Sequence, residues 1–422
     1  MDATTRPAPA IPLSDDGPRG ERLPASLGAR LAATAALPAP VLAVDVEAFD
    51  ANARELLARA DGRPLRLATK SVRVPALVER ALAAGFQGLM TYSLAEALWW
   101  SARVDDVLMG YPTVDRAALA RLAADPHARR TVTLMVDDVA HLDLVAEAVA
   151  NADAPDMPPV RVCLDIDASL RLGPVHLGVR RSPLRTPEDA VALARQATRR
   201  GIEVRGVMFY EAQVAGLPDT SPAVRLVKRA SLAELLRRRG AVVGALEEAL
   251  GAPLLVNGGG TGSIATTRLD PTVTEITSGS GLLSPTLFDG YHLRPGQSPL
   301  RPAAFIGLDV VRRPAEGYVT AFSGGYIASG PVGRSRAPRP VLPTGLRLTG
   351  NEGAGEVQTP LRGAATRGIA IGDRVWLRHA KAGEVMERFA EVALVSGGGD
   401  GDAADAVVDR ATTYRGEGLT FG

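Results

Sequence analysis

Short apolar runs alternate with amphipathic stretches along the first two thirds of the chain. Nine runs between residues 40 and 280 are rich in β-branched and other apolar residues. They cover residues 40–46, 65–71, 88–93, 106–111, 131–138, 160–167, 203–210, 254–257 and 273–277. The stretches between them have helical periodicity. Apolar strands that alternate with helices predict a parallel sheet covered by helices, and eight such units in roughly 250 residues is the size of a closed (β/α)8 barrel.

The nine runs exceed the eight strands of such a barrel by one. We expect the surplus strand to be the first, at 40–46, and to pair outside the barrel with the C-terminal part of the chain. Past residue 300 the pattern changes. Apolar runs at 304–311, 317–322, 368–377 and 389–395 have no long helices between them, and Gly and Pro are frequent. This pattern is typical of a smaller all-β domain.

These patterns predict an α/β fold in which a (β/α)8 TIM barrel carries a smaller C-terminal all-β domain. We expect the barrel in residues 38–300 and the β domain in residues 301–422. Residues 1–37 are rich in Pro, Ala and Arg. We expect them to form an N-terminal arm that is partly disordered or packed on the β domain.

The charge balance excludes several classes of partner. The 422 residues include 48 basic and 47 acidic side chains, which leave a formal net charge of +1. Such balance provides no electrostatic attraction to nucleic acid or to an anionic membrane. No apolar run reaches the roughly 20 residues of a membrane helix, and residues 1–38 contain no apolar signal-peptide core. We therefore expect a cytoplasmic protein that binds neither nucleic acid nor membranes.

Lysine is rare in this chain, so each lysine is informative. Only three of the 48 basic residues are lysines, at positions 70, 228 and 381, and the other 45 are arginines. Arginine replaces lysine where only charge matters, but it has no amine that can lose its proton. Lys70 ends an apolar run, and strand ends of this kind form the active-site face of a barrel. A partly desolvated amine there is available to form a Schiff base, although a lysine that only extends to solvent is the alternative.

Two loops rich in small residues follow the last two barrel runs. They are Asn-Gly-Gly-Gly-Thr-Gly-Ser at 257–263 and Thr-Ser-Gly-Ser-Gly at 277–281. Glycine lets backbone N–H groups approach an anion, hydroxyl groups add donors, and barrels of this kind bind phosphate after strands 7 and 8. The sequence therefore predicts a phosphate site, with plain turns as the alternative. Its expected members are Gly259, Gly260, Thr261, Gly262, Ser278, Gly279 and Ser280.

Polar residues at two further strand ends are candidates for cofactor or substrate binding. Tyr210 and Gln213 follow one apolar run and are expected to face the barrel mouth, although Tyr210 can equally be a core residue. Arg171 follows another run, and more positive charge comes at 180–181. A buried Arg171 can bind a carboxylate in bidentate fashion, or it can pair with a neighbouring aspartate.

A polar loop in the C-terminal part combines three kinds of titratable side chain. His379, Lys381 and Glu384 follow an apolar run closely. An imidazole, an amine and a carboxylate in one loop suit proton transfer or metal binding, with an ordinary polar hairpin as the alternative. We expect His379 and Lys381 to be catalytic together with Lys70.

These segments together resemble a known family. The chain is similar to the D-threonine aldolase and D-serine dehydratase group of pyridoxal-phosphate enzymes, which have fold type III and an alanine-racemase-like barrel. The resemblance spans roughly residues 38–395. The segments that carry it are Arg66-Leu-Ala-Thr-Lys70-Ser71-Val-Arg73, the strand end at Tyr210, the loop Gly258–Ser263, the turn Ser278–Ser280 and His379-Ala-Lys381.

The resemblance implies a cofactor and an assembly. It implies that Lys70 forms a Schiff base with pyridoxal 5′-phosphate, that the two glycine-rich loops hold the phosphate, and that Tyr210 lies near the pyridine ring. It further implies that the run at 40–46 joins the β domain. The protein is expected to be a head-to-tail homodimer in which each β domain closes the partner's site.

Two positions depart from the family pattern. The family carries a histidine shortly before the Schiff-base lysine, where this chain has Leu67-Ala68. It also binds a divalent metal through a histidine followed two positions later by Cys or Asp, where this chain has Lys381 after His379. Because an ammonium group repels a cation, we favour the absence of metal, with the charge of Lys381 in its place. If metal is present, we expect His379 and Glu384 to bind it.

The resemblance predicts a pyridoxal-phosphate-dependent lyase for a β-hydroxy amino acid of D configuration. Its reaction is either retro-aldol cleavage or dehydration followed by deamination. A pyridoxal-phosphate-dependent racemase or decarboxylase is the first alternative. A barrel aldolase that uses its lysine without a cofactor and a non-catalytic pyridoxal-phosphate-binding protein are further alternatives. The residues after 300, with their His379 loop, argue against the non-catalytic protein.

Overall fold

The described part of the chain contains a closed barrel and a separate large sheet. The computed structural model describes residues 23, 25–154, 156–219, 221–381, 383–397 and 406–422. The barrel closes in the order β10-β11-β2-β3-β4-β5-β6-β9, and all neighbouring strands are parallel. Its strands are β2 (Leu65–Ala68), β3 (Leu89–Thr91), β4 (Val107–Met109), β5 (Val132–Val136), β6 (Arg161–Asp165), β9 (Glu203–Phe209), β10 (Leu255–Gly258) and β11 (Glu275–Ser278). The predicted eight-stranded barrel is confirmed.

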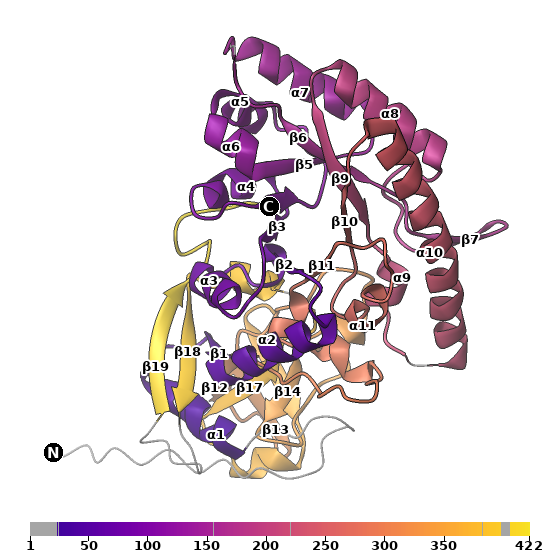
Figure 1. Ribbon diagram of the computed structural model, residues 1–422. Coiled ribbons are helices and arrows are strands. Elements are labelled where there is room, and N and C mark those ends of the chain that lie inside the picture. The colour runs from indigo at the N-terminus through magenta and orange to yellow at the C-terminus, as the bar shows by residue number, and fades with distance from the viewer. Residues whose placement is uncertain (1–22, 24, 155, 220, 382, 398–405) are drawn as a thin grey trace.

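Helices surround the barrel on its outer side (Figure 1). The longer ones are α2 (Val46–Ala60), α3 (Pro75–Ala83), α4 (Leu94–Ser101), α5 (Arg116–Ala124), α7 (Val139–Asn151), α8 (Pro187–Arg199) and α10 (Pro222–Leu250). Side chains at strand-to-helix junctions cap the first turns. Ser93 accepts a hydrogen bond from the Glu96 amide, and Thr186 and Asp189 form a reciprocal capping box. These caps direct each chain segment back across the barrel surface.

Side chains fill the inside of the barrel, so the barrel is a packed core. Leu108, Met135, Cys163 and Met208 form a buried cluster from four strands. Arg66, which is fully buried, makes ion pairs of 2.7 Å with Glu275 and with Asp106. The buried guanidinium is therefore neutralised below the mouth.

The surplus strand lies outside the barrel. β1 (Val41–Asp45) pairs antiparallel with β12 (Ala304–Arg312) and parallel with β18 (Glu391–Gly397). It is thus a central strand of the nine-stranded sheet, as the strand count led us to expect. The other strands are β13 (Tyr318–Phe322), β14 (Arg339–Leu342), β15 (Arg347–Leu348), β16 (Gln358–Arg362), β17 (Arg374–Arg378) and β19 (Ala406–Thr412). Of these, β14, β15, β16 and β19 were not expected, because their sequences show no regular alternation of apolar and polar residues.

The N-terminal segment that the structure describes packs on the β domain. In α1 (Ala25–Ala32), Leu27 and Leu31 are buried in a cluster with Phe305 and Trp376. Figure 1 shows α1 against the sheet, on the side away from the barrel. Residues 1–22 of the expected arm lie outside the described residues. Among the helices of the described ranges, none is both long and apolar enough to cross a bilayer.

Candidate active site

Lys70 lies at the mouth of the barrel. It belongs to the short helical turn η2 (Thr69–Ser71), which follows β2 directly. Its side chain is half-buried, and Nζ donates a 2.7 Å hydrogen bond to the hydroxyl oxygen of Tyr111. Tyr111 follows the end of β4, so two parallel strands bring an amine and a phenol together at one end of the barrel. Sequence reasoning missed Tyr111, although its place just after a barrel strand was a usable signal.

Positive charge surrounds the phenol of Tyr111. Burial on its own raises the pKa of Tyr111, but the charge and hydrogen bond of Lys70 and the charge of Arg181 outweigh it, so the pKa lies below its usual value. The guanidinium carbon of Arg181 lies 5.4 Å from the centre of the Tyr111 ring and 5.2 Å from the centre of the Tyr210 ring. Arg181 therefore places the Tyr210 ring close to Tyr111, the hydrogen-bond partner of Lys70.

A buried carboxyl group adjoins this cluster. Asp165, the last residue of β6, is 6% exposed. Burial and then the negative charge of Asp137 raise its pKa to about 7, and the charge of Arg181 partly offsets them. The guanidinium group of Arg181 is thus attracted by the carboxyl group of Asp165 and by the rings of Tyr111 and Tyr210.

Arg171 lies away from the mouth. It is part of a hairpin of β7 (Leu170–Leu172) and β8 (Val175–Leu177), which projects from the barrel in Figure 1. Its side chain is 47% exposed, and its Nη2 atom pairs with Asp167 at 2.6 Å. The pairing with a neighbouring aspartate is therefore the alternative that the structure favours. The sequence alone did not show whether Arg171 or Arg181 lies at the mouth, because the path of the hairpin between them decides it.

Gln213 has a backbone partner. Its Nε2 atom donates a 2.7 Å hydrogen bond to the carbonyl oxygen of Ala168, while Oε1 has no hydrogen-bond partner among the described residues. The side chain is buried and thereby ties the segment after β9 to the segment after β6. Gln213 supports the wall of the mouth beside Tyr210.

The two glycine-rich loops meet each other and the Lys70 turn. The hydroxyl oxygens of Thr261 and Ser278 share a 2.8 Å hydrogen bond, and the Gly281 amide donates to the Thr261 hydroxyl at 3.1 Å. The hydroxyl groups of Ser71 and Ser280 share a hydrogen bond of 2.9 Å. The loops follow β10 and β11, which are the seventh and eighth barrel strands counted from β2. The predicted phosphate residues are therefore brought together directly beside Lys70.

Glycine is required at these loops by the closeness of other atoms. A Cβ atom at Gly279 would lie 2.6 Å from the Ala68 carbonyl oxygen, and one at Gly262 would lie 2.3 Å from the Tyr291 ring. At Gly260 it would lie 2.8 Å from the Cβ atom of Ala215. Each of these loops therefore presents bare backbone, which is what a phosphate-binding loop needs.

A buried carboxylate holds the first loop in shape. Glu211 is completely buried and accepts hydrogen bonds from the Gly259 amide at 3.1 Å and from the Ser263 hydroxyl at 3.2 Å. It also accepts a hydrogen bond from Thr267, and Arg239 lies 3.6 Å away. Sequence reasoning did not assign this role, since a Glu after a strand end has no distinctive pattern.

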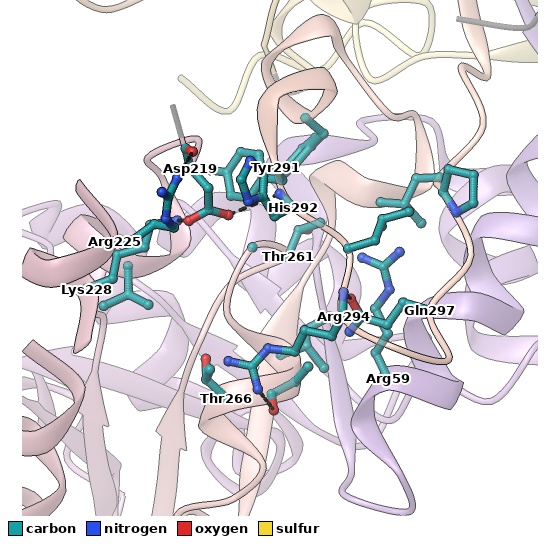
Figure 2. A pocket seen from close by; sticks show the side chains of 18 of the residues that line it. Arg59, Asp219, Arg225, Lys228, Thr261, Thr266, Tyr291, His292, Arg294 and Gln297 are labelled. Atoms are coloured by element: carbon teal, nitrogen blue, oxygen red, sulfur yellow. Dashed lines mark hydrogen bonds and ion pairs between the residues drawn. The ribbon is translucent and has the colours of Figure 1, made fainter. Parts of the chain in front are cut away.

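A cavity lies on another side of the first loop, and Lys70 is not among the residues that line it. It has a volume of about 520 Å³ and is lined by Thr261, Gly262 and several basic residues. Figure 2 shows Lys228 beside Asp219 and Tyr291 in this cavity. The Lys228 amine pairs with Asp219 at 2.9 Å and lies 4.9 Å from the centre of the Tyr291 ring. Lys228 is therefore neutralised, and we assign it a structural role.

The loop after β17 packs on the Lys70 turn of the same chain. A Cβ atom at Gly383 would lie 2.4 Å from the carbonyl carbon and oxygen of Ser71, so the two backbones are in contact. Arg73 and Glu387 form an ion pair of 2.8 Å across the same junction. The β domain thus contacts the Lys70 segment at the mouth within one chain.

His379 and Lys381 have very different surroundings. His379 is 3% exposed, neither ring nitrogen makes a well-formed hydrogen bond, and burial together with the charge of Arg378 lowers its pKa to about 3. Lys381 is half-buried, and its amine donates a 3.3 Å hydrogen bond to the Ser329 carbonyl oxygen. Burial, then the charges of Arg336 and Lys70, lower the pKa of Lys381. Lys381 is thus close enough to Lys70 for the two charges to interact, whereas the His379 ring is enclosed.

The donor set of this loop does not suit a metal ion. Glu384 accepts a hydrogen bond from the Ser329 amide at 3.0 Å. Within the described ranges, no three His, Cys, Asp or Glu side chains are grouped so that they could hold an ion. The expected alternative, an ion held by His379 and Glu384, would also face the ammonium group of Lys381.

Solved structures with the same architecture identify the fold. A D-threonine aldolase from Filomicrobium marinum superposes with a TM-score of 0.75 at 21% identity, over 90% of this chain and 97% of that chain. A D-threo-3-hydroxyaspartate dehydratase from Delftia sp. HT23 gives 0.68 at 20% identity, over 90% and 98%. An alanine-racemase-like protein from Idiomarina loihiensis gives 0.67 at 16% identity, over 90% and 97%. The chain has an alanine-racemase-like fold.

The predicted resemblance is confirmed at the level of the fold. No protein-family model matches the chain. No curated protein sequence matches it either. One solved structure of the dehydratase is a cysteine mutant in its metal-free form. At identities near 20% the superpositions establish the architecture but not the reaction.

Proposed function

We propose that the chain is a pyridoxal-phosphate-dependent lyase that acts on a β-hydroxy amino acid of D configuration. The observation that carries the proposal is the Ser71–Ser280 hydrogen bond, which joins the Lys70 turn to a glycine-rich loop. A cofactor that carries an aldehyde and a phosphate on one small ring needs an amine and a phosphate-binding loop side by side. The structural relatives, an aldolase and a dehydratase for β-hydroxy amino acids by their names, agree with this proposal.

The residues present fit this cofactor. Lys70 would hold its aldehyde carbon, the hydroxyl groups of Thr261, Ser278 and Ser280 and the loop amides would hold its phosphate, and Tyr210 would lie near its ring. A Cβ atom at Gly279 would overlap the Ala68 carbonyl oxygen, so glycine lets this turn lie directly against the Lys70 segment. When bound, the cofactor supplies an electron sink for a bond broken at the substrate Cα atom.

The chain's own side chains supply binding and proton transfer. When its amine is free, Lys70 would serve as a base for the α-proton of the substrate, and Tyr111 would orient this amine through their hydrogen bond. Arg181 supplies a positive charge at the mouth that suits a substrate carboxylate. Loss of the α-proton leads to dehydration, whereas loss of a proton from the β-hydroxyl group leads to cleavage between Cα and Cβ.

A matched pair of lysine variants tests the proposal. In Lys70→Arg the charge is kept but the reactive amine is lost, so we expect no covalently bound cofactor and no turnover. Lys228→Arg makes the same change at the lysine that is paired with Asp219. We expect this variant to keep the covalently bound cofactor and to keep turnover. Borohydride reduction followed by peptide mass analysis locates the modified lysine. Wild-type protein that takes up no pyridoxal phosphate, or cofactor bonded elsewhere than at Lys70, would refute the proposal.

The two reactions and the first alternative differ in their products. D- and L-β-hydroxy amino acids should be tested for release of an aldehyde, which indicates cleavage, and of a keto acid, which indicates dehydration. A racemase is the second candidate, because Lys381 approaches from the β domain while Lys70 belongs to the barrel. Deuterium incorporation into both enantiomers without loss of substrate would favour the racemase.

We also propose a homodimer, which sedimentation analysis of the holoenzyme tests.

A further inference from the structure

The three lysines differ in what neutralises them. Lys228 pairs with the Asp219 carboxylate at 2.9 Å, and Lys70 donates to Tyr111 at 2.7 Å. Lys381 has a backbone carbonyl as its hydrogen-bond partner, and among the described residues no carboxylate oxygen lies within ion-pairing distance of its amine. Lys381 therefore resembles Lys70 in having no carboxylate hydrogen-bonded to its amine among the described residues, although the charge of Glu384 acts on it.

The position of Lys381 is imposed by the fold. Gly383 brings the loop into backbone contact with Ser71, and the Arg73–Glu387 ion pair fastens the next turn to the same segment. The Ser329 carbonyl holds the amine on its other side at 3.3 Å. The ammonium group is therefore held at the β-domain side of the mouth, near Lys70.

The same loop argues against a divalent ion. In the family that the sequence resembles, a metal is bound by a histidine and by a Cys or Asp two positions later. Here the second position is Lys381, which repels a cation, and the His379 ring is enclosed in the β domain. In this loop the ammonium group of Lys381 therefore stands at the position where the family has a metal ligand.

We propose that Lys381 donates a hydrogen bond to the side-chain oxygen of the substrate and that the protein works without a divalent metal. This inference rests on the proposed function and adds the group that selects β-hydroxy amino acids over those without a hydroxyl group. The ammonium group stabilises negative charge that develops on that oxygen, whichever neighbouring bond breaks. A site built to hydrogen-bond a hydroxyl group discriminates against the analogue that lacks it.

Ligand binding to the holoenzyme tests the first part of the inference. The probes are D-threonine and D-2-aminobutyrate, which differ by the hydroxyl group, and the readout is the change in cofactor absorbance on titration. In Lys381→Met we expect the Kd of D-threonine to rise about 10-fold or more, the effect of losing a charged donor, while the Kd of D-2-aminobutyrate changes less than about twofold. Lys381→Arg should restore most of the difference. Equal weakening of both ligands, or of neither, overturns the inference.

Metal analysis tests the second part independently of activity. Purified holoenzyme should contain no stoichiometric divalent metal, and chelation should leave the D-threonine titration unchanged. Stoichiometric zinc, manganese or magnesium would overturn this part. Cofactor uptake distinguishes failure of the proposed function from failure of this inference. A wild-type chain that binds no cofactor refutes the proposed function and this inference with it, whereas normal uptake with the wrong ligand pattern refutes the inference alone.

Discussion

The Nζ atom of Lys70 and the hydroxyl oxygen of Tyr111 are joined by a 2.7 Å hydrogen bond, although they belong to segments after different barrel strands. The charge and the hydrogen bond of Lys70 lower the pKa of Tyr111 against the opposing effect of burial. In the proposed function this pair provides the reactive amine and the phenol that orients it.

The first prediction concerns this pair. Tyr111→Phe removes the hydroxyl group but keeps the ring, so we expect pyridoxal phosphate to remain bonded to Lys70. Turnover should fall by roughly 100-fold, the lower end of what a positioned proton-transfer group contributes. Steady-state kinetics and cofactor content are the measurements. Tyr318→Phe, on an exposed strand, is the control, and equal turnover of the Tyr111 variant and wild type would contradict the assignment.

The second prediction concerns the carboxylate under the first glycine-rich loop. Glu211→Gln replaces an acceptor of several hydrogen bonds by a group that is partly a donor, so the Gly259 amide and its neighbours lose a matched partner. We expect the free energy of unfolding to fall by about 1–3 kcal/mol and the Kd of pyridoxal phosphate to rise. Urea unfolding and cofactor titration measure these effects. Glu248→Gln, on an exposed helix position, should change neither.

The third prediction compares two glycines. A Cβ atom at Gly262 would lie 2.4 Å from the Ala215 carbonyl oxygen, which is backbone and cannot move aside easily. Gly262→Ala should therefore destabilise the fold by about 1–3 kcal/mol. Gly244 lies within helix α10 with no atom near its Cβ position, so Gly244→Ala should stabilise by up to about 1 kcal/mol. Thermal and urea unfolding distinguish these opposite signs, and a stable, fully loaded Gly262→Ala protein would refute the steric argument.

The fourth prediction is a pH dependence of stability. Burial raises the pKa of Asp165 in the folded protein to about 7 from an ordinary value near 4, so the folded state binds this proton more tightly than the unfolded state. The contribution of Asp165 to the free energy of unfolding therefore falls as pH rises from about 4 to about 7.

Substitution of Asp165 should remove this loss. At about 1.4 kcal/mol per pKa unit, Asp165→Asn should gain up to roughly 4 kcal/mol relative to wild type between pH 4 and pH 8. Urea unfolding at the two pH values measures the gain. Asp143→Asn, at a carboxylate that is 61% exposed, provides the comparison. A difference between variant and wild type that does not depend on pH would contradict the raised pKa.

The fifth prediction separates two arginines. Arg181 lies over the rings of Tyr111 and Tyr210, whereas Arg171 is paired with Asp167 on an exposed hairpin. Arg181→Gln should raise the KM for the amino acid substrate about 10-fold or more, because a charged partner of the carboxylate is lost. Arg171→Gln should leave KM within about twofold of wild type. A larger rise in KM for Arg171→Gln than for Arg181→Gln would instead identify Arg171 as the residue that binds the substrate carboxylate.

The architecture could be predicted from local sequence patterns. Strand and helix periodicities depend on neighbours a few residues apart, so the nine apolar runs, including the one that later proved to be β1, could be found without a structure. Lys70 and the two glycine-rich loops were found for the same reason, since position after a barrel strand is itself a local property. The rarity of lysine then singled out Lys70 from ordinary surface charge.

The details of the site depend on packing between residues far apart in the chain. Whether Arg171 or Arg181 reaches the mouth depends on the path of a hairpin, and whether His379 is enclosed depends on how the β domain closes around it. Glu211 gains its role only when the loop at Gly259 folds back over it. Such contacts leave no periodic signal in the sequence, because they arise from the meeting of surfaces whose positions the whole fold sets.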